Sequence, residues 1–284
     1  MKPSAFAYAR PRALEEAFAL LDKHGENAKL LAGGQSLLAS LNMRLAAPEI
    51  LVDIGAIPGL DGIAVRGQTL VIGARTTHRA IERSEAVAKH APLLAQAAPH
   101  IAHVAIRNAG TLGGSLAMAD PAAEWPACCV ALQATIVVTS KKGERRVAAT
   151  DFFKDLYTTA LGAGELITAV EIPCVEKGER HAFLELVRRR GDYAIVGLAA
   201  RARLKGKTLS GVQLVYLGVG VTPVQAKGAM AALEGKTADD AAIRAAQDAI
   251  ARDLEPNADI YTSAEAKRHL ARVLVARAVA ALVG

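Results

Sequence analysis

Two short loops, each built on adjacent glycines with a hydroxyl side chain nearby, most constrain what this chain can fold into. They are Ala32-Gly33-Gly34-Gln35-Ser36 and Thr111-Leu112-Gly113-Gly114-Ser115. Glycine lets backbone N–H groups approach a ligand without a Cβ in the way, and N–H groups gathered in a turn bind anions. Either loop alone is also consistent with a plain strand-to-helix turn. Together they predict two loops that close on one extended anionic ligand, such as a pyrophosphate-containing dinucleotide.

The common nucleotide and catalytic motifs are absent from the sequence. Gly218-Val219-Gly220 lacks the third glycine of a Rossmann fingerprint, and Gly235-Lys236-Thr237 lacks the first glycine of a P-loop because Met230 stands there. We therefore expect the latter to be a turn between helices. His100 and His103 are three residues apart but have no third ligand, which favours a capping or packing role. No nucleophile elbow or close carboxylate pair stands out, so we expect a cofactor to carry the chemistry.

Composition limits the class of protein further. A chain of 284 residues predicts one large domain or two modest ones. The three cysteines, Cys128, Cys129 and Cys174, exclude a disulfide framework and a CxxC metal site, and we expect them to be buried. No apolar run is long enough to span a membrane and the start lacks a signal-peptide pattern, which favours the cytoplasm.

The net charge of +6 is concentrated in one stretch. Residues 177–207 hold nine Lys or Arg against three Asp or Glu, so the rest of the chain is balanced. Such a stretch is typical of contact with an acidic protein partner or an anionic cofactor. Nucleic acid is disfavoured because the stretch has few aromatics and matches no nucleic-acid motif.

Hydrophobic periodicity predicts an alternating first part and a strand-then-helix second part, divided by a charged connector at 173–179. In the first part we expect a helix at 13–24, strands at 29–32, 50–54 and 69–73, helices within 79–99, a helix opened by Pro121, a hairpin of 135–140 and 145–149, and a strand at 166–172. In the second part we expect strands at 181–188, 194–204 and 208–219, followed by helices at 223–234, 238–253 and 263–283.

Five ordered segments carry a resemblance to a known family. They are AGGQSLL at 32–38, TLGGSLAMADPAAEWPA at 111–127, DFF at 151–153, ELITAVEIP at 165–173 and RRRGDYAIVG at 188–197. The chain resembles the FAD-binding medium subunit of molybdenum hydroxylases, which include carbon monoxide and xanthine dehydrogenases. The resemblance implies an α+β fold. A two-lobed FAD-binding domain of the vanillyl-alcohol-oxidase type would occupy 1–175, and a small domain of a three-stranded sheet with packed helices would occupy 176–284.

The resemblance also implies the residues that contact FAD. These are Ala32, Gly33, Gly34, Gln35, Ser36, Leu37, Ile101, Thr111, Leu112, Gly113, Gly114, Ser115, Glu124, Ile167 and Tyr193. The two glycine loops would hold the pyrophosphate. Ile101 and Ile167 would pack on the flavin or adenine, Tyr193 would lie beside the isoalloxazine, and Glu124 would accept a ribityl hydroxyl. Replacing Gly33 or Gly114 with Val is then expected to abolish FAD binding and to leave the fold intact.

Several positions depart from the family pattern. The family often has Asn at Met118, usually has Asp at Glu124, and often has a Lys near the flavin at Glu185, so that last contact is not carried over. Carbon monoxide dehydrogenases commonly have His at Gln35, which disfavours carbon monoxide as the substrate. The cysteine-rich insertion that carries an extra iron–sulfur cluster in some relatives is absent.

The implied function is electron transfer inside a larger complex. A large subunit would hold the molybdenum cofactor and hydroxylate the substrate, and a small subunit would hold [2Fe-2S] clusters. Electrons would pass to FAD on this chain and on to an external acceptor, in a heterotrimer or a dimer of heterotrimers. One alternative is a self-contained flavin oxidase of the vanillyl-alcohol-oxidase superfamily, which would need its own catalytic base. The other is a protein that has lost its flavin.

Overall fold

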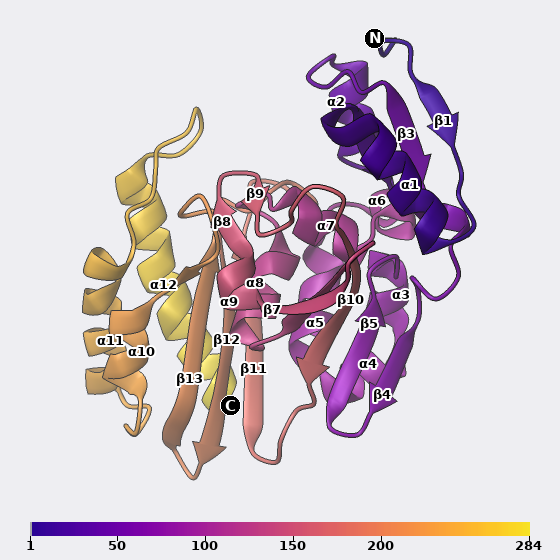
Figure 1. Cartoon of the computed structure of the whole chain (residues 1–284). Helices are drawn as coiled ribbons and strands as arrows, with labels where there is room; N and C mark the ends of the chain where they lie inside the picture. The colour runs from indigo at the N-terminus through magenta and orange to yellow at the C-terminus, as the bar shows by residue number, and fades with distance from the viewer. Residues whose placement is uncertain (1) are drawn as a thin grey trace.

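The computed structural model describes residues 2–284, which begin with a small N-terminal lobe (Figure 1). Its parallel sheet has the order β1-β3-β2. The lobe contains β1 (Ala7–Ala9), α1 (Leu14–His24), η1 (Gly25–Asn27), β2 (Ala28–Leu31), α2 (Leu37–Asn42), β3 (Ile50–Asp53) and η2 (Ile54–Ala56). Helix α1 buries Ala17, Phe18 and Leu21 on one face and ends where Gly25 adopts φ 53°. Such a conformation favours glycine.

The second lobe is built on an antiparallel sheet in the order β4-β5-β10-β6-β7. Its strands are β4 (Ile63–Arg66), β5 (Thr69–Gly73), β6 (Thr135–Ser140), β7 (Gly143–Ala148) and β10 (Leu166–Pro173). Short helices pack against this sheet and contribute many of the buried apolar residues of this core. They are α3 (His78–Arg83), α4 (Glu85–His90), α5 (Pro92–Ala97), η3 (Ala98–His100), α6 (Val104–Ala109), α7 (Leu112–Met118), α8 (Glu124–Ala131) and α9 (Ala149–Phe152), with a small hairpin of β8 (Phe153–Asp155) and β9 (Thr158–Thr159).

The C-terminal part is a sheet covered on one face by helices (Figure 1). Its three long strands are β11 (Glu179–Leu186), β12 (Val196–Lys205) and β13 (Thr208–Leu217), and the short β14 (Val224–Gln225) adds to the edge. The helices are α10 (Lys227–Leu233), α11 (Asp240–Asp253) and α12 (Ala264–Val283). Side chains of a strand alternate between faces. Accordingly Ala182 joins the core under the helices, whereas Phe183 joins the core of the second lobe.

The α+β fold with a two-lobed first domain is confirmed, and so are the expected long strands and helices of the C-terminal part. Two predicted helix starts are wrong. The helix expected from Pro121 begins at Glu124, because the Asp120 carboxylate accepts the Ala122 N–H and holds this segment in a turn. The helix expected from 223 begins at Lys227, because Val224 and Gln225 pair with β13 instead.

The structure also bears on the expected turn at 235–237, the cysteines and the search for a membrane-spanning helix. Residues 235–237 form the turn between α10 and α11, as predicted. The three cysteines are buried, also as predicted. No helix within residues 2–284 is long and apolar enough to cross a membrane.

Candidate functional site

The first glycine loop connects β2 to α2 and turns its backbone N–H groups outward. Among the described residues, the N–H groups of 33–37 have no intramolecular acceptor; the first N–H bonds of this segment run from Leu38 to Gly34 and from Ser40 to Ser36. Gly34 has φ 71°, a left-handed conformation of the kind found in the turns that form anion-binding nests. The Gln35 amide donates to the Gly33 carbonyl at 3.0 Å and so orders the turn. This loop therefore has the geometry of an anion-binding nest.

The second glycine loop differs, because its N–H groups at 112–115 are already used. The Leu112 N–H donates to Thr76 O at 3.0 Å, Gly113 to Ala74 O at 2.7 Å and Ser115 to Thr111 O at 3.1 Å. The Gly114 N–H donates to Thr111 Oγ1 at 3.1 Å, in an N-cap of α7. The expectation that both loops offer free N–H groups is therefore wrong for this one. What it presents is the Ser115 hydroxyl at the first turn of α7.

The glycines of both loops also permit close backbone packing. A Cβ at Gly33 would lie 2.1 Å from the Ala109 carbonyl oxygen, and a Cβ at Gly113 would lie 2.6 Å from Ala74 Cβ. At Gly114 the only close atom is Thr111 Oγ1, at 2.8 Å. Thus Gly33 joins the two lobes, and a side chain there would separate them. The sequence alone does not distinguish Gly33 from Gly114, because each belongs to a pair of adjacent glycines.

A cavity of about 490 Å³ lies where the two lobes meet. Ala32 and Gly33 of the first loop line one wall, and Thr111 of the second loop with Asp61 and Arg75 lines the other. This volume falls in the range of small-molecule sites, which usually run from about 300 to 1,000 Å³. The cleft between the lobes, with the N–H nest at its edge, is therefore the candidate site.

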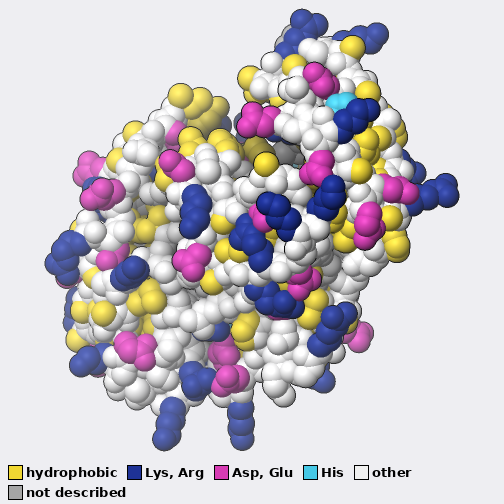
Figure 2. Space-filling view, in the orientation of Figure 1, with side chains coloured by type: hydrophobic (Ala, Val, Ile, Leu, Met, Phe, Trp, Pro, Cys, Tyr) yellow, Lys and Arg dark blue, Asp and Glu magenta, His cyan; other side chains and the backbone are white. Residues whose placement is uncertain are grey.

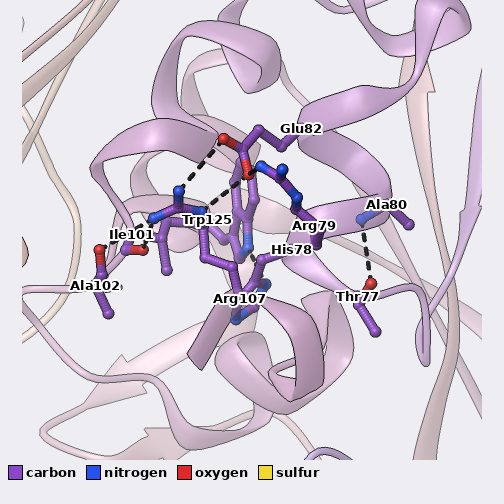
Figure 3. Close-up of polar contacts among 9 residues, drawn as sticks. All are labelled: Thr77, His78, Arg79, Ala80, Glu82, Ile101, Ala102, Arg107 and Trp125. Carbon is purple, nitrogen blue, oxygen red and sulfur yellow. Dashed lines mark hydrogen bonds and ion pairs between the residues drawn. The ribbon is translucent and has the colours of Figure 1, made fainter. Parts of the chain in front are cut away.

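Ile101 is held in place by a buried arginine (Figure 3). Arg107 Nη1 donates to the carbonyls of Ile101 at 2.9 Å and Ala102 at 3.1 Å, and its Nε donates to Glu82 Oε2 at 2.9 Å. Ala102 has φ 41°, a strained conformation for a residue other than glycine. Burial alone would raise the pKa of Glu82, but hydrogen bonds from Arg79 and Arg107 lower it and keep it ionised. The charge network thus fixes the turn that positions Ile101.

A second buried contact supports α8, the helix that begins at Glu124 (Figure 3). Trp125 Nε1 donates to His78 Nδ1 at 2.9 Å, and both side chains are enclosed. Burial, and then the nearby Arg107 charge, lower the pKa of His78 to about 4. His78 is therefore neutral and acts as an acceptor. Neither role was visible in the sequence, because the two residues are far apart along the chain.

The remaining predicted residues occupy different environments. Ile101 and Ile167 are buried members of one apolar core, and Ile167 lies at an irregularity in the pairing of β10 with β6. Tyr193 is 72% exposed, in the loop between β11 and β12. Glu124 is only 8% exposed, and burial raises its pKa to about 7. Met118, where the family often has Asn, ends α7 and is half-buried.

The structure buries a carboxyl group, Glu185, that the sequence did not single out as buried. Glu185, on β11, lies in the electrostatic range of Glu124 on α8, and burial followed by the Glu124 charge raises the pKa of Glu185 to about 8. The signal for this burial was only the alternation of β11, which points Glu185 to the same face as Phe183.

The basic stretch 177–207 is partly paired within the chain. Arg203 forms an ion pair with Glu176, and Arg188 lies over the Tyr261 ring at 4.2 Å from its centre. Figure 2 shows Lys and Arg side chains spread over the visible face, with Asp and Glu between them. No group of three or more His, Cys, Asp or Glu side chains able to hold a metal occurs among residues 2–284.

Comparison with known proteins places this architecture in a family. Residues 4–175 match the FAD-binding domain in molybdopterin dehydrogenase, and residues 181–282 match the C-terminal domain of the carbon monoxide dehydrogenase flavoprotein. The chain is 39% identical to the 6-hydroxypseudooxynicotine dehydrogenase complex subunit alpha of Paenarthrobacter nicotinovorans, over 99% of this chain and 95% of the relative. It is 38% identical to the carbon monoxide dehydrogenase medium chain of Hydrogenophaga pseudoflava, over 98% and 97%.

Solved structures agree. A carbon monoxide dehydrogenase from Hydrogenophaga pseudoflava that lacks the Mo-pyranopterin moiety of its cofactor matches with a TM-score of 0.97 and 40% identity, over 99% of this chain and 98% of that one. Quinoline 2-oxidoreductase from Pseudomonas putida 86 matches with a TM-score of 0.94 and 38% identity, over 99% and 98%. The chain therefore belongs to the family of FAD-binding medium subunits of the molybdenum hydroxylases.

Proposed function

We propose that this chain binds FAD in the cleft between its two lobes and serves as the electron-transfer flavoprotein of a molybdenum hydroxylase complex. The observation that carries the proposal is the run of N–H groups at 33–37, which have no acceptor of their own in the described chain and flank the left-handed Gly34. A diphosphate offers oxygens to several such donors at once, so the donor set fits the pyrophosphate of FAD.

The other predicted residues would contact the remaining parts of FAD. The Ser115 hydroxyl and the Thr111–Ser115 turn would complete the pyrophosphate site from the second lobe. Ile101 and Ile167 would pack on the ring systems, and Tyr193 would cover the isoalloxazine, where an aromatic contact contributes about 0.5–1.5 kcal/mol beyond area burial. Glu124 would accept a ribityl hydroxyl. When bound, FAD accepts and donates electrons, and the chain supplies its position and its electrostatic surroundings.

The partners follow from the same role. We propose a large subunit that holds the molybdenum cofactor and a small subunit that holds [2Fe-2S] clusters and reduces the FAD of this chain. The basic stretch 177–207 would face one of these partners or the anionic part of FAD. A self-contained oxidase is not favoured, because relatives that match over nearly the whole chain carry the names of complex subunits or medium chains. We also propose a cytoplasmic location and a domain boundary at 175/176.

The test is a visible absorption spectrum of the purified chain, with the released chromophore identified by mass spectrometry. We expect one bound FAD per chain and no iron–sulfur or molybdenum signal. Inorganic pyrophosphate should compete with FAD for the chain stripped of flavin, because both would occupy the N–H nest at 33–37. A well-folded chain that takes up no FAD would reject the function. FAD binding that pyrophosphate does not weaken would reject this placement of the diphosphate.

A further inference from the structure

Glu185 is a buried carboxyl group without a hydrogen-bond partner. Its side chain is 1% exposed, and neither carboxylate oxygen finds a donor in residues 2–284. It lies on β11, on the face that packs against the second lobe, as its neighbour Phe183 shows. A buried ionised carboxylate without donors is strongly unfavourable, whereas the neutral acid is tolerated. The position therefore favours a protonated side chain.

No cation in contact with Glu185 offsets this preference. The groups that face it are His100 from η3 and the acidic side chains Glu124 and Cys128 from α8. Burial, then the Cys129, Glu124 and Glu185 charges, raise the pKa of the Cys128 thiol, so it stays uncharged. Burial followed by the Glu124 charge raises the pKa of Glu185 itself to about 8.

His100 connects this enclosed acid to solvent. Its Nδ1 lies 3.5 Å from Glu185 Oε2, while its own side chain is 41% exposed. The imidazole packs on the Phe183 ring, with 5.2 Å between centres, which holds it in place. Burial, with the Arg190 charge, lowers the pKa of His100, so the ring is neutral near pH 7. A neutral imidazole accepts a proton on one nitrogen and donates from the other, so it can relay one.

Some of the residues that the proposed function places around the flavin ring lie near this pair. His100 directly precedes Ile101, and a Cβ at Gly191, two residues before Tyr193, would lie 2.4 Å from the His103 ring. Desolvation, then the nearby Asp120, Tyr157 and Glu124 charges, raise the pKa of Tyr193. Glu185 therefore lies at the side of the site that Ile101, Glu124 and Tyr193 would form.

We propose that Glu185 is held as a neutral carboxylic acid at the junction of the two domains and exchanges its proton with solvent through His100, so that its proton occupancy sets the charge beside the flavin. This inference rests on the proposed function for the place of the flavin. The protonation of Glu185 and its path through His100 do not depend on it. Glu185 therefore acts on the cofactor only through the charge that it places nearby, and it is not a catalytic residue.

The protonation is tested first, on the chain stripped of FAD, by infrared titration of the carboxylic-acid C=O band in H₂O and D₂O. We expect a deuterium-sensitive acid component that titrates near pH 8 and disappears in Glu185→Gln. The matched control is Glu179→Gln, on the same strand, because Glu179 is already paired with Arg201 and His181. It should leave the component unchanged. Absence of the component from the unmodified chain overturns the proposal, even if Glu185→Gln fails to fold.

The proton path is tested with His100→Gln, in which the acid component should remain but exchange with deuterium several-fold more slowly. Unchanged exchange would exclude the His100 path. The effect on the cofactor is tested by the midpoint potential of bound FAD against pH. Below the pKa of Glu185 the unmodified chain and Glu185→Gln should coincide, because both are neutral there. Above it the unmodified chain should have the lower potential, because an added negative charge disfavours reduction.

The outcomes separate the two proposals. Parallel potential curves over the whole pH range would show that Glu185 does not set the charge beside the flavin. A chain that binds no FAD would reject the proposed function, while the infrared titration and the deuterium exchange would still decide whether Glu185 holds a proton and passes it through His100.

Discussion

Replacing Arg107 with Met removes the group that holds the turn carrying Ile101. The Arg107 side chain is 7% exposed and pairs with Glu82, whose side chain is 15% exposed. Its loss leaves the Ile101 and Ala102 carbonyls without a donor and Glu82 with only one cation. Removing one partner of a buried ion pair costs about 3–5 kcal/mol. Because Glu82 keeps its ion pair with Arg79, we expect the free energy of unfolding to fall by about 3 kcal/mol, the low end of this range.

The assay is urea denaturation of the flavin-free chain, followed by circular dichroism and Trp125 fluorescence. Arg79→Met is the matched control, because Arg79 pairs with the same carboxylate at 2.8 Å but is 26% exposed and makes no bond to the turn. It should cost less than about 1 kcal/mol, as exposed pairs do. Arg107→Met should also weaken FAD binding through Ile101. Equal losses in the two variants would refute the argument that burial and the two carbonyl bonds decide the difference.

Two further predictions concern packing and pH. Gly114→Val should weaken FAD binding but leave the chain folded, because the new Cβ would crowd only the Thr111 hydroxyl. Gly33→Val should weaken FAD binding and also destabilise the chain, because its Cβ would meet the Ala109 backbone. Urea midpoints and FAD titrations of both variants check this, and an unaltered midpoint for Gly33→Val would contradict it. The pKa of His78 lies at about 4 when folded, below its unfolded value of 6.5, so the contribution of the neutral ring is lost as pH falls through that window. The chain should lose about 2 kcal/mol between pH 7 and pH 5 from this residue, and His78→Asn should have a correspondingly flatter stability profile.

Much of the fold follows from local sequence. The amphipathic spacing of 14–24 with Gly25 behind it, the alternating strand at 166–173 and the three long strands before the C-terminal helices were predictable, because each depends on neighbours along the chain. The short strands were not predicted: β1 has three residues and is defined by pairing with β3, which is distant in sequence. β4 has four residues and pairs with the neighbouring β5. The start of α8 was predicted too early because the Asp120 carboxylate accepts the Ala122 N–H and holds the residues after Pro121 in a turn.

The sequence alone determined the kind of ligand, because paired glycines beside hydroxyls are a local feature and their order along the chain identifies the family. Tertiary structure decided which loop has donors to give: the N–H groups of 112–114 are consumed by Ala74, Thr76 and a capping threonine, while those of 33–37 are free. It also decided the charge state of the site. Glu124 and Glu185 are ordinary acids in the sequence, and burial in the folded chain raises the pKa of Glu124 to about 7 and that of Glu185 to about 8.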